Sequence, residues 1–205
     1  MTACSACRAS HVGCKSSENA GGAPATIGER AVTIIEMLVV IMVIFILAAL
    51  VLAASSYVQN KGARARAETE IAAMSAALES YKADNGIYPR QVDGASDTLD
   101  ARTSFNASAY SASSFYLYEQ LAGVASGSRT AAPTNRTYFT FKPAMLLPAP
   151  PSTADITAIR DPFGNSYGYS TANQKDSSKG YNPTYDLWST ANDTASNSTK
   201  WIKNW

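Results

Sequence analysis

The stretch that decides the fold is "RAVTIIEMLVVIMVIFILAALVLAASSYVQNK", which runs from Arg30 to Lys61. Between these two basic residues, Glu36 is the only charged side chain. The eighteen residues 37–54 that follow it are all apolar or alanine, which is long enough for a membrane-spanning helix. A carboxylate at the edge of hydrocarbon is costly and is therefore a functional candidate. The alternative is that Glu36 lies at the membrane surface with its carboxylate in water.

The residues after this run continue it as an amphipathic helix. Apolar side chains recur there at spacings of three and four, which marks one face of a helix. They are Ala67, Ile71, Met74, Leu78 and Tyr81. Between Thr33 and Asp84 only Gly62 disfavours a helix, by about 1 kcal/mol. We therefore expect one helix of about fifty residues, roughly 75 Å long. Two helices hinged near Gly62 are the alternative.

The distribution of cysteine and histidine excludes several kinds of site. The three cysteines and the single histidine all lie in the first fourteen residues, as Cys4, Cys7, His11 and Cys14. The rest of the chain therefore has no Cys or Ser-His nucleophile, no zinc ligand of these types and no disulfide. The N-terminal cluster could hold zinc, but its loops are short. Residues 1–30 lack apolar periodicity and are expected to be disordered or removed.

Composition also argues against two broad functions. A net charge of +1 lacks the basic excess of nucleic-acid-binding proteins, so no nucleic acid is expected as a partner. An enzyme would have to use carboxylates, lysine or tyrosine. A membrane-tethered hydrolase would need a carboxylate pair, and Asp155 and Asp161 have no convincing partner. We therefore do not expect an enzyme.

The remainder of the chain predicts an α+β head, in which a helical spine carries a small antiparallel sheet. "SSFYLYEQLAGV" (113–124) indicates a short helix closed by Gly123, and "TYFTFKP" (137–143) alternates like a strand. The proline-rich residues 143–152 are expected to connect elements without a helix. A turn at Asp161-Pro162 and Gly164-Asn165 leads to a strand with Tyr167 and Tyr169, and "YDLWS" (185–189) is a further strand. Structural roles are expected for Asp161, Tyr167 and Tyr169.

Four segments together resemble a known family. "AVTIIEMLVVIMVIFILAALV" (31–51) is similar to the class III signal of type IV pilins and type II secretion pseudopilins. "AETEIAAMSAALESYKADNGIYPR" (67–90) resembles the helix and Tyr-Pro pattern of the major pseudopilin of type II secretion systems. "RDPFGNSYGYS" (160–170) and residues 185–205 resemble that family's hairpin and C-terminal loop. Residues 91–160 are left as a variable region.

The resemblance implies a processed, exported subunit. A prepilin peptidase would cut between Ala31 and Val32, which places Glu36 fifth in the mature chain and leaves the Val32 amine to be methylated. The chain then divides into a leader (1–31), a transmembrane and filament-core helix (32–62) and a head (63–205). Within the head, an amphipathic helix (63–84) precedes the variable region and a C-terminal sheet and loop (161–205).

The resemblance also implies a location and an assembly. A count of basic residues would favour a cytoplasmic head, with Lys15 and Arg30 on one side and Lys61, Arg64 and Arg66 on the other. The family's export route instead implies a single-pass inner-membrane protein with its head in the periplasm. Expected partners are copies of the chain, other pseudopilins, the prepilin peptidase and the inner-membrane assembly platform.

Within such a filament, the Val32 amine would be neutralised by Glu36 of the same or a neighbouring subunit, which would set the register of assembly. The family often has glycine and proline where this chain has Phe45 and Ala53, which implies a straighter helix here. A type IV pilus or minor pilin for adhesion, motility or DNA uptake is the alternative to a secretion pseudopilus. The head has no cysteine for the pilin disulfide, and this favours secretion.

The family's C-terminal loop binds calcium, but its ligands are only partly present here. Asp193 matches a family aspartate, whereas Thr199 and Trp201 stand where later aspartates are found. Asp186 could add a ligand, which gives a possible weak calcium site with few carboxylates. Asn192, Asn197 and backbone carbonyls could supply further oxygens. The alternative is a loop closed by hydrogen bonds and by packing of Trp188, Trp201 and Trp205.

Overall fold

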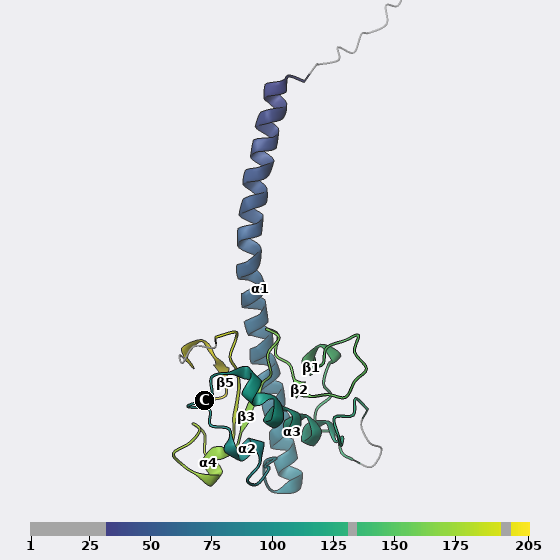
Figure 1. The fold of residues 1–205 in the computed structure, drawn as a ribbon, viewed down its shortest axis with the longest axis vertical. Coiled ribbons are helices and arrows are strands. Elements are labelled where there is room, and N and C mark those ends of the chain that lie inside the picture. The colour runs from purple at the N-terminus through teal and green to yellow at the C-terminus, as the bar shows by residue number, and fades with distance from the viewer. Residues whose placement is uncertain (1–31, 131–134, 194–197) are drawn as a thin grey trace, which may run out of the picture. The chain divides into compact units, whose positions relative to one another are not determined.

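The computed structural model describes residues 32–130, 135–193 and 198–205 (Figure 1). The expected leader, Ala31 and the N-terminal cysteine and histidine cluster lie outside the described residues. The chain divides at Leu47–Ala48 into two units, and both contain part of the first helix.

The first helix, α1, runs without interruption from Ile34 to Asn85, over 52 residues. Gly62 lies inside it, so the prediction of one continuous helix is confirmed and the hinged alternative is wrong. The helix ends at Asn85. Gly86 follows it with a positive φ of 79° and donates its N–H to the carbonyl of Lys82. Glycine adopts this conformation without the steric cost of a side chain, which makes it a common helix terminator.

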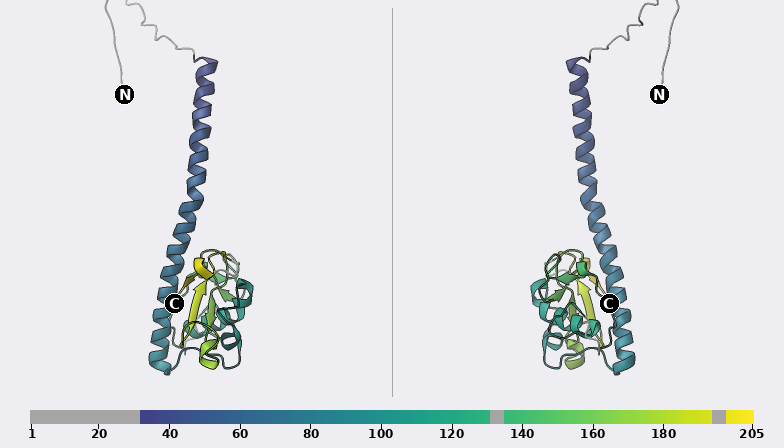
Figure 2. Two further views of the ribbon diagram at one scale, coloured as in Figure 1. Left: turned by 90° about the vertical axis from the view of Figure 1, so that its left-hand side faces the viewer. Right: turned by 90° about the vertical axis from the view of Figure 1, so that its right-hand side faces the viewer.

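The second half of α1 contributes the predicted stripe to the core of the unit Ala48–Trp205. Ala67, Ile71, Met74 and Leu78 are buried, and Tyr81 packs on the core as a partly buried ring. They share one core cluster with Leu117 and Leu121 of α3, Ile159 of β2, Leu187 of β4 and Tyr167, which precedes β3. Figure 2 shows strands of the head beside this part of α1. Burial of this stripe removes apolar surface from water and so stabilises the unit.

The remaining elements are short. The helices are α2 (Ala95–Thr98), α3 (Ser111–Ala122) and α4 (Ala172–Lys175), with 3₁₀ turns at Ala107–Tyr110, Pro143–Met145 and Ser198–Lys200. The strands are β1 (Leu146–Leu147), β2 (Ala158–Ile159), β3 (Gly168–Ser170), β4 (Asp186–Ser189) and β5 (Ile202–Lys203). In the described part of the chain, two antiparallel sheets form, in the orders β1-β2 and β3-β4-β5. The α+β prediction is therefore confirmed.

Several local predictions hold and two are wrong. The proline-rich residues 143–152, expected to be a connection without a helix, contain the 3₁₀ turn Pro143–Met145 and strand β1, because proline is tolerated at the start of a helical turn. Gly123 closes α3 with a left-handed φ of 70°, and β3 and β4 occupy the predicted segments. Residues 137–143, however, form no strand. The N–H groups of Tyr138 and Phe139 both donate to the carbonyl of Leu121, at 2.8 and 3.0 Å. This segment therefore supplies hydrogen-bond donors to a carbonyl at the C-terminal end of α3. Strand β1 lies in the proline-rich stretch after it.

The sheet β3-β4-β5 is built around Trp188, which is fully buried. Gly168 is its partner across β3 and β4, and a Cβ at Gly168 would lie 2.2 Å from the indole ring, so only glycine fits there. Trp201 stacks on Trp188 with ring centroids 6.0 Å apart, and Trp205 meets it edge-on at 5.9 Å. The expected tryptophan packing at the C-terminus is therefore present.

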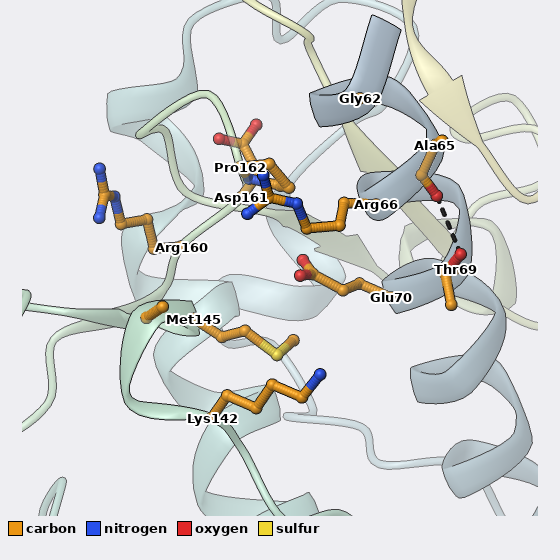
Figure 3. Close-up of a pocket in the computed structure, with 11 residues that line it drawn as sticks. Gly62, Ala65, Arg66, Thr69, Glu70, Lys142, Met145, Arg160, Asp161 and Pro162 are labelled. Atoms are coloured by element: carbon orange, nitrogen blue, oxygen red, sulfur yellow. Dashed lines mark hydrogen bonds between the residues drawn. The ribbon is translucent and has the colours of Figure 1, made fainter. Parts of the chain in front are cut away.

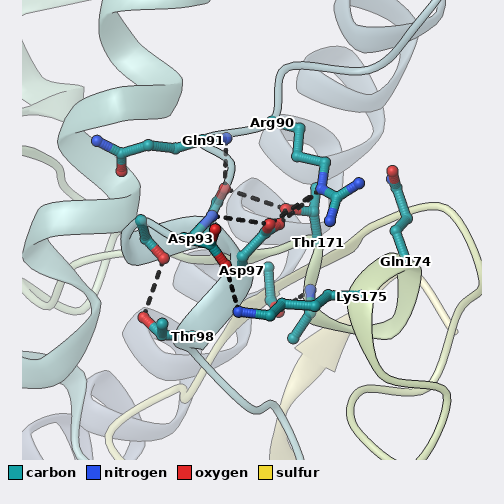
Figure 4. Close-up of polar contacts among 12 residues, drawn as sticks. Arg90, Gln91, Asp93, Asp97, Thr98, Thr171, Gln174 and Lys175 are labelled. Atoms are coloured by element: carbon teal, nitrogen blue, oxygen red, sulfur yellow. Dashed lines mark hydrogen bonds and ion pairs between the residues drawn. The ribbon is translucent and has the colours of Figure 1, made fainter.

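A buried carboxylate joins α2 to the segment after β3 (Figure 4). The side chain of Asp97 has no exposed surface and accepts hydrogen bonds from Arg90 Nε at 2.9 and 3.0 Å. Thr171 Oγ1 donates to Asp97 at 2.8 Å, and the Asp93 N–H donates at 3.2 Å. Burial acts to raise the pKa of Asp97, but Arg90 and the hydrogen bonds lower it below its ordinary value.

Substitution of Asp97 by asparagine should lower the free energy of unfolding by about 2 kcal/mol near neutral pH, because Arg90 loses its buried partner. Since the folded-state pKa is lowered, this contribution is complete above the unfolded value of about 3.9 and is lost as pH falls through the folded value. Urea unfolding of the chain in neutral detergent, followed by tryptophan fluorescence, measures both effects.

The matched control is Lys175→Gln, which removes the exposed ion pair between Lys175 and Asp93. Exposed pairs contribute little, so this variant should unfold nearly as the wild type does. Equal destabilisation by the two substitutions, or an Asp97→Asn effect that persists at low pH, would contradict the assigned role of Asp97.

Candidate functional site

The first turn of α1 holds the candidate assembly residue, Glu36. The Thr33 carbonyl accepts the N–H groups of Glu36 and Met37 at 3.1 and 3.2 Å. Thr33 Oγ1 also accepts the Glu36 N–H, at 3.3 Å. A threonine followed three residues later by glutamate is the capping-box sequence of a helix N-terminus. This role of Thr33 was not predicted from the sequence, although the Thr-x-x-Glu spacing before an apolar run indicates it.

Glu36 is thereby placed where a negative charge is favoured. The N-terminal end of a helix carries a partial positive charge from its unpaired N–H groups, which stabilises a nearby carboxylate. The Glu36 side chain is exposed on the surface of α1. Val32 is also exposed, with an exposed fraction of 54%. Val32 lies before the helix and four positions ahead of Glu36, and Ala31, on the other side of the expected cleavage point, lies outside the described residues.

The part of α1 that follows Glu36 has apolar side chains on every side. Consecutive large apolar residues are more than two-fifths exposed, including Leu38 at 61%, Phe45 at 69% and Leu52 at 71%. A helix that is apolar all round is stable in a bilayer or packed among other helices, not in water. By length and composition α1 can cross a membrane. The site is therefore a carboxylate at the start of a surface that requires non-aqueous surroundings.

The residues of the predicted hairpin have structural contacts. Asp161 is buried and its Oδ1 accepts the N–H groups of Phe163 and Asn165, at 3.0 and 2.8 Å. Its Oδ2 accepts the hydroxyl of Ser189 at 2.6 Å. Burial raises the pKa of Asp161 in spite of these hydrogen bonds. The Tyr169 hydroxyl donates to the Pro89 carbonyl at 2.7 Å. Asp161 therefore shapes the turn before β3, and its carboxylate is already engaged.

The two expected calcium ligands serve different contacts. Asp186 is buried and accepts the N–H groups of Tyr181 and Asn182, at 2.8 and 2.9 Å, and burial raises its pKa. The Asp193 carbonyl accepts the indole N–H of Trp201 at 3.1 Å. Within the described ranges, no three acidic, histidine or cysteine side chains are grouped to hold a metal. Asn197 lies outside them, so calcium binding and the alternative of a loop closed without an ion both stay open to experiment.

Comparison with known proteins supports the resemblance in part. Type II secretion system core protein G of Escherichia coli (strain K12) is 35% identical to this chain over 79 residues. The match covers 38% of this chain and 54% of that protein, so the chain spans about half the length of the curated relative it matches. No protein-family model matches the chain, and no solved structure matches it. The similarity supports a relationship to type II secretion proteins.

The contacts of Asp186 lead to a prediction about calcium. Asp186→Ala should lower the melting temperature equally with calcium and with chelator, because the N–H groups of Tyr181 and Asn182 lose their acceptor. Calcium alone should leave the wild-type melting temperature unchanged. The measurement is thermal unfolding of the whole chain in neutral detergent, with Asp193→Ala measured in parallel.

A retained calcium site would give a different result. A site with a Kd of about 10⁻⁴ M would add about 1.4 kcal/mol once calcium reached roughly ten times Kd. A calcium-dependent rise in melting temperature that Asp193→Ala removes would therefore show that this loop is closed by an ion.

Proposed function

We propose that this chain is a structural subunit of a pilin-like filament that serves protein export by type II secretion. The observation that carries the proposal is the all-round apolar surface of α1, which begins directly after Glu36. The partial similarity to core protein G supports the assignment to secretion. In this function the chain is not an enzyme, and its activity consists of assembly with copies of itself and with other pseudopilins.

Assembly would use the two parts of α1 differently. The apolar part spans the inner membrane before assembly and packs against the same part of other subunits afterwards. The part from Ala67 to Leu78 stays in the core of the head and holds the head to the helix. A head in the periplasm, an assembly platform in the inner membrane and a filament in the periplasm complete the proposal.

The alternative, a type IV pilus or minor pilin, uses the same helix. It differs in what the head presents, namely an adhesive or DNA-binding surface. In the described part of the head, a core cluster contains Trp188, and Asp97 accepts a hydrogen bond from Thr171. The similarity to core protein G favours secretion over a surface pilus.

Glu36 would have two separable roles, as a helix-capping residue and as a charge partner. Cleavage before Val32 would create an amine four residues ahead of Glu36 in the same chain. In the dry interior of a filament an unpaired charge costs several kcal/mol. The carboxylate of Glu36, from the same or a neighbouring subunit, would neutralise the amine and select one axial register.

Processing can be tested by mass spectrometry of the chain purified from membranes of cells that contain a prepilin peptidase. The mature chain should begin at Val32, with the mass of one added methyl group on its amine. The unprocessed chain from cells without the peptidase is the control. A mature chain that retains Arg30 would contradict the assignment of Ala31 and Val32 as the cleavage site.

The two roles of Glu36 are distinguished by a pair of substitutions. Glu36→Gln keeps a side chain suited to the capping box but removes the charge, so it should leave processing and membrane insertion intact. It should reduce filament yield by more than about a hundredfold, since breaking a buried charge pair costs roughly 3–5 kcal/mol. Glu36→Asp should be partly tolerated because it keeps the carboxylate.

The matched control is Thr33→Val, which removes the capping hydroxyl and keeps Glu36. It costs about 1 kcal/mol of helix stability and should still assemble. Filaments are quantified by shearing and electron microscopy. If Thr33→Val abolished filaments while Glu36→Gln assembled normally, Glu36 would act as a helix cap and the charge-pair proposal would be wrong.

A further inference from the structure

The surface of the head contains a hollow of about 450 Å³ whose charged lining has no assigned role (Figure 3). One wall is α1 between Gly62 and Glu70, and the other is formed by residues 142–145 and 160–162. Three cations line it, Arg66, Lys142 and Arg160. We call this hollow the basic pocket. A volume of this size suits a small ligand.

Among the residues that the structure describes, none forms an ion pair with a cation of the basic pocket. The ion pairs of the described residues are Arg90–Asp97, Arg136–Asp84 and Lys175–Asp93, and none of them includes a pocket residue. Arg66 and Lys142 are exposed and both line the pocket, and the positive charge of each acts to lower the pKa of Glu70. Arg160 lies on the far side of the pocket from Glu70 in Figure 3.

The two carboxylates of the basic pocket make hydrogen bonds to the protein interior. Glu70 accepts the hydroxyl of Tyr167 at 2.7 Å, and Asp161 holds the turn before β3. Burial raises the pKa of Glu70, although the hydrogen bond from Tyr167 and the charges of Arg66 and Lys142 act to lower it. With three cations and two carboxylates in its lining, the pocket has an excess of one positive charge.

We propose that the basic pocket binds a phosphate-bearing anion. Arg66 offers a planar guanidinium that can hold two phosphate oxygens, and Lys142 offers an ammonium from the opposite wall. Met145 and Pro162 also line the pocket and add apolar surface to its wall. The proposal concerns the head alone and does not depend on filament assembly.

The phosphate could be free in solution or part of a lipid headgroup. Arg66 lies twelve residues beyond Ala54, the end of the apolar run, which is about 18 Å along the helix. The headgroup layer extends only about 5–8 Å beyond the hydrocarbon, so a helix upright in a membrane holds Arg66 outside this layer, which favours a soluble source. The two sources are therefore separated by experiment.

The first arm titrates the whole chain in neutral detergent with inorganic phosphate at constant ionic strength, followed by phosphorus NMR line width. Binding to the wild type should saturate. The double variant Arg66→Gln/Lys142→Gln should weaken binding at least tenfold. Lys179→Gln, a lysine that does not line the pocket, should change nothing. The melting temperature of each variant shows that the head is folded.

The second arm places the wild type and the double variant in nanodiscs of phosphatidylglycerol or phosphatidylcholine. The phosphorus NMR line width of the lipid phosphate is measured, and a difference between the two chains reports contact of Arg66 and Lys142 with lipid. Contact that requires phosphatidylglycerol and both cations identifies a lipid source, whereas saturable binding of inorganic phosphate alone identifies a soluble one. If neither arm detects binding, or if the double variant binds as the wild type does, the proposal is overturned. If the double variant loses only self-association, the pocket receives an acidic segment of a second copy, which also overturns it.

Discussion

The structure depends on a change in the surface of one helix. From Ile34 to Leu52, α1 exposes apolar side chains on all sides, and from Ala67 to Leu78 it buries a single stripe. Because the backbone hydrogen bonds of a helix are satisfied internally, the same element can serve in hydrocarbon and in a folded head. The first surface requires lipid or other helices, and the second requires a core beside it. The rest of the chain supplies that core.

The elements of the head are too short to be stable alone. The strands have two to four residues each, and α2 and α4 have four. Isolated short strands and helices are marginal in water, so each depends on packing against its neighbours. Packing around Trp188 and the hydrogen bonds of Asp97 and Asp161 join these short elements to one another.

Features set by periodicity could be predicted from the sequence, and features set by distant partners could not. The apolar stripe of α1, the closure of α3 by Gly123 and the strands at 168–170 and 186–189 follow from local spacing and turn residues. The segment 137–143 has the alternation of a strand, yet its N–H groups find a carbonyl at the end of α3 instead. These hydrogen bonds depend on the position of α3 in three dimensions, which cannot be predicted from the alternation of apolar and polar residues.

The same distinction applies to the sites. Glu36 could be predicted as a functional residue because it is a charge beside an apolar run. The capping role of Thr33 was not predicted, although the Thr-x-x-Glu spacing indicates it. Asp186 was assigned to calcium by resemblance, and only the structure shows its carboxylate bound to the turn at Tyr181 and Asn182. The basic pocket joins residues about eighty and a hundred positions apart, and no local pattern could reveal it.

The central claim is that the apolar surface of α1 packs against copies of itself. A photo-crosslinking residue at Ile41, irradiated in intact cells that contain the secretion machinery, tests it most directly, with the same residue at exposed Val92 on the head as reference. The account predicts a ladder of products at multiples of the mature chain mass from position 41. Adducts to lipid alone at position 41, with no product larger than one chain, would contradict it.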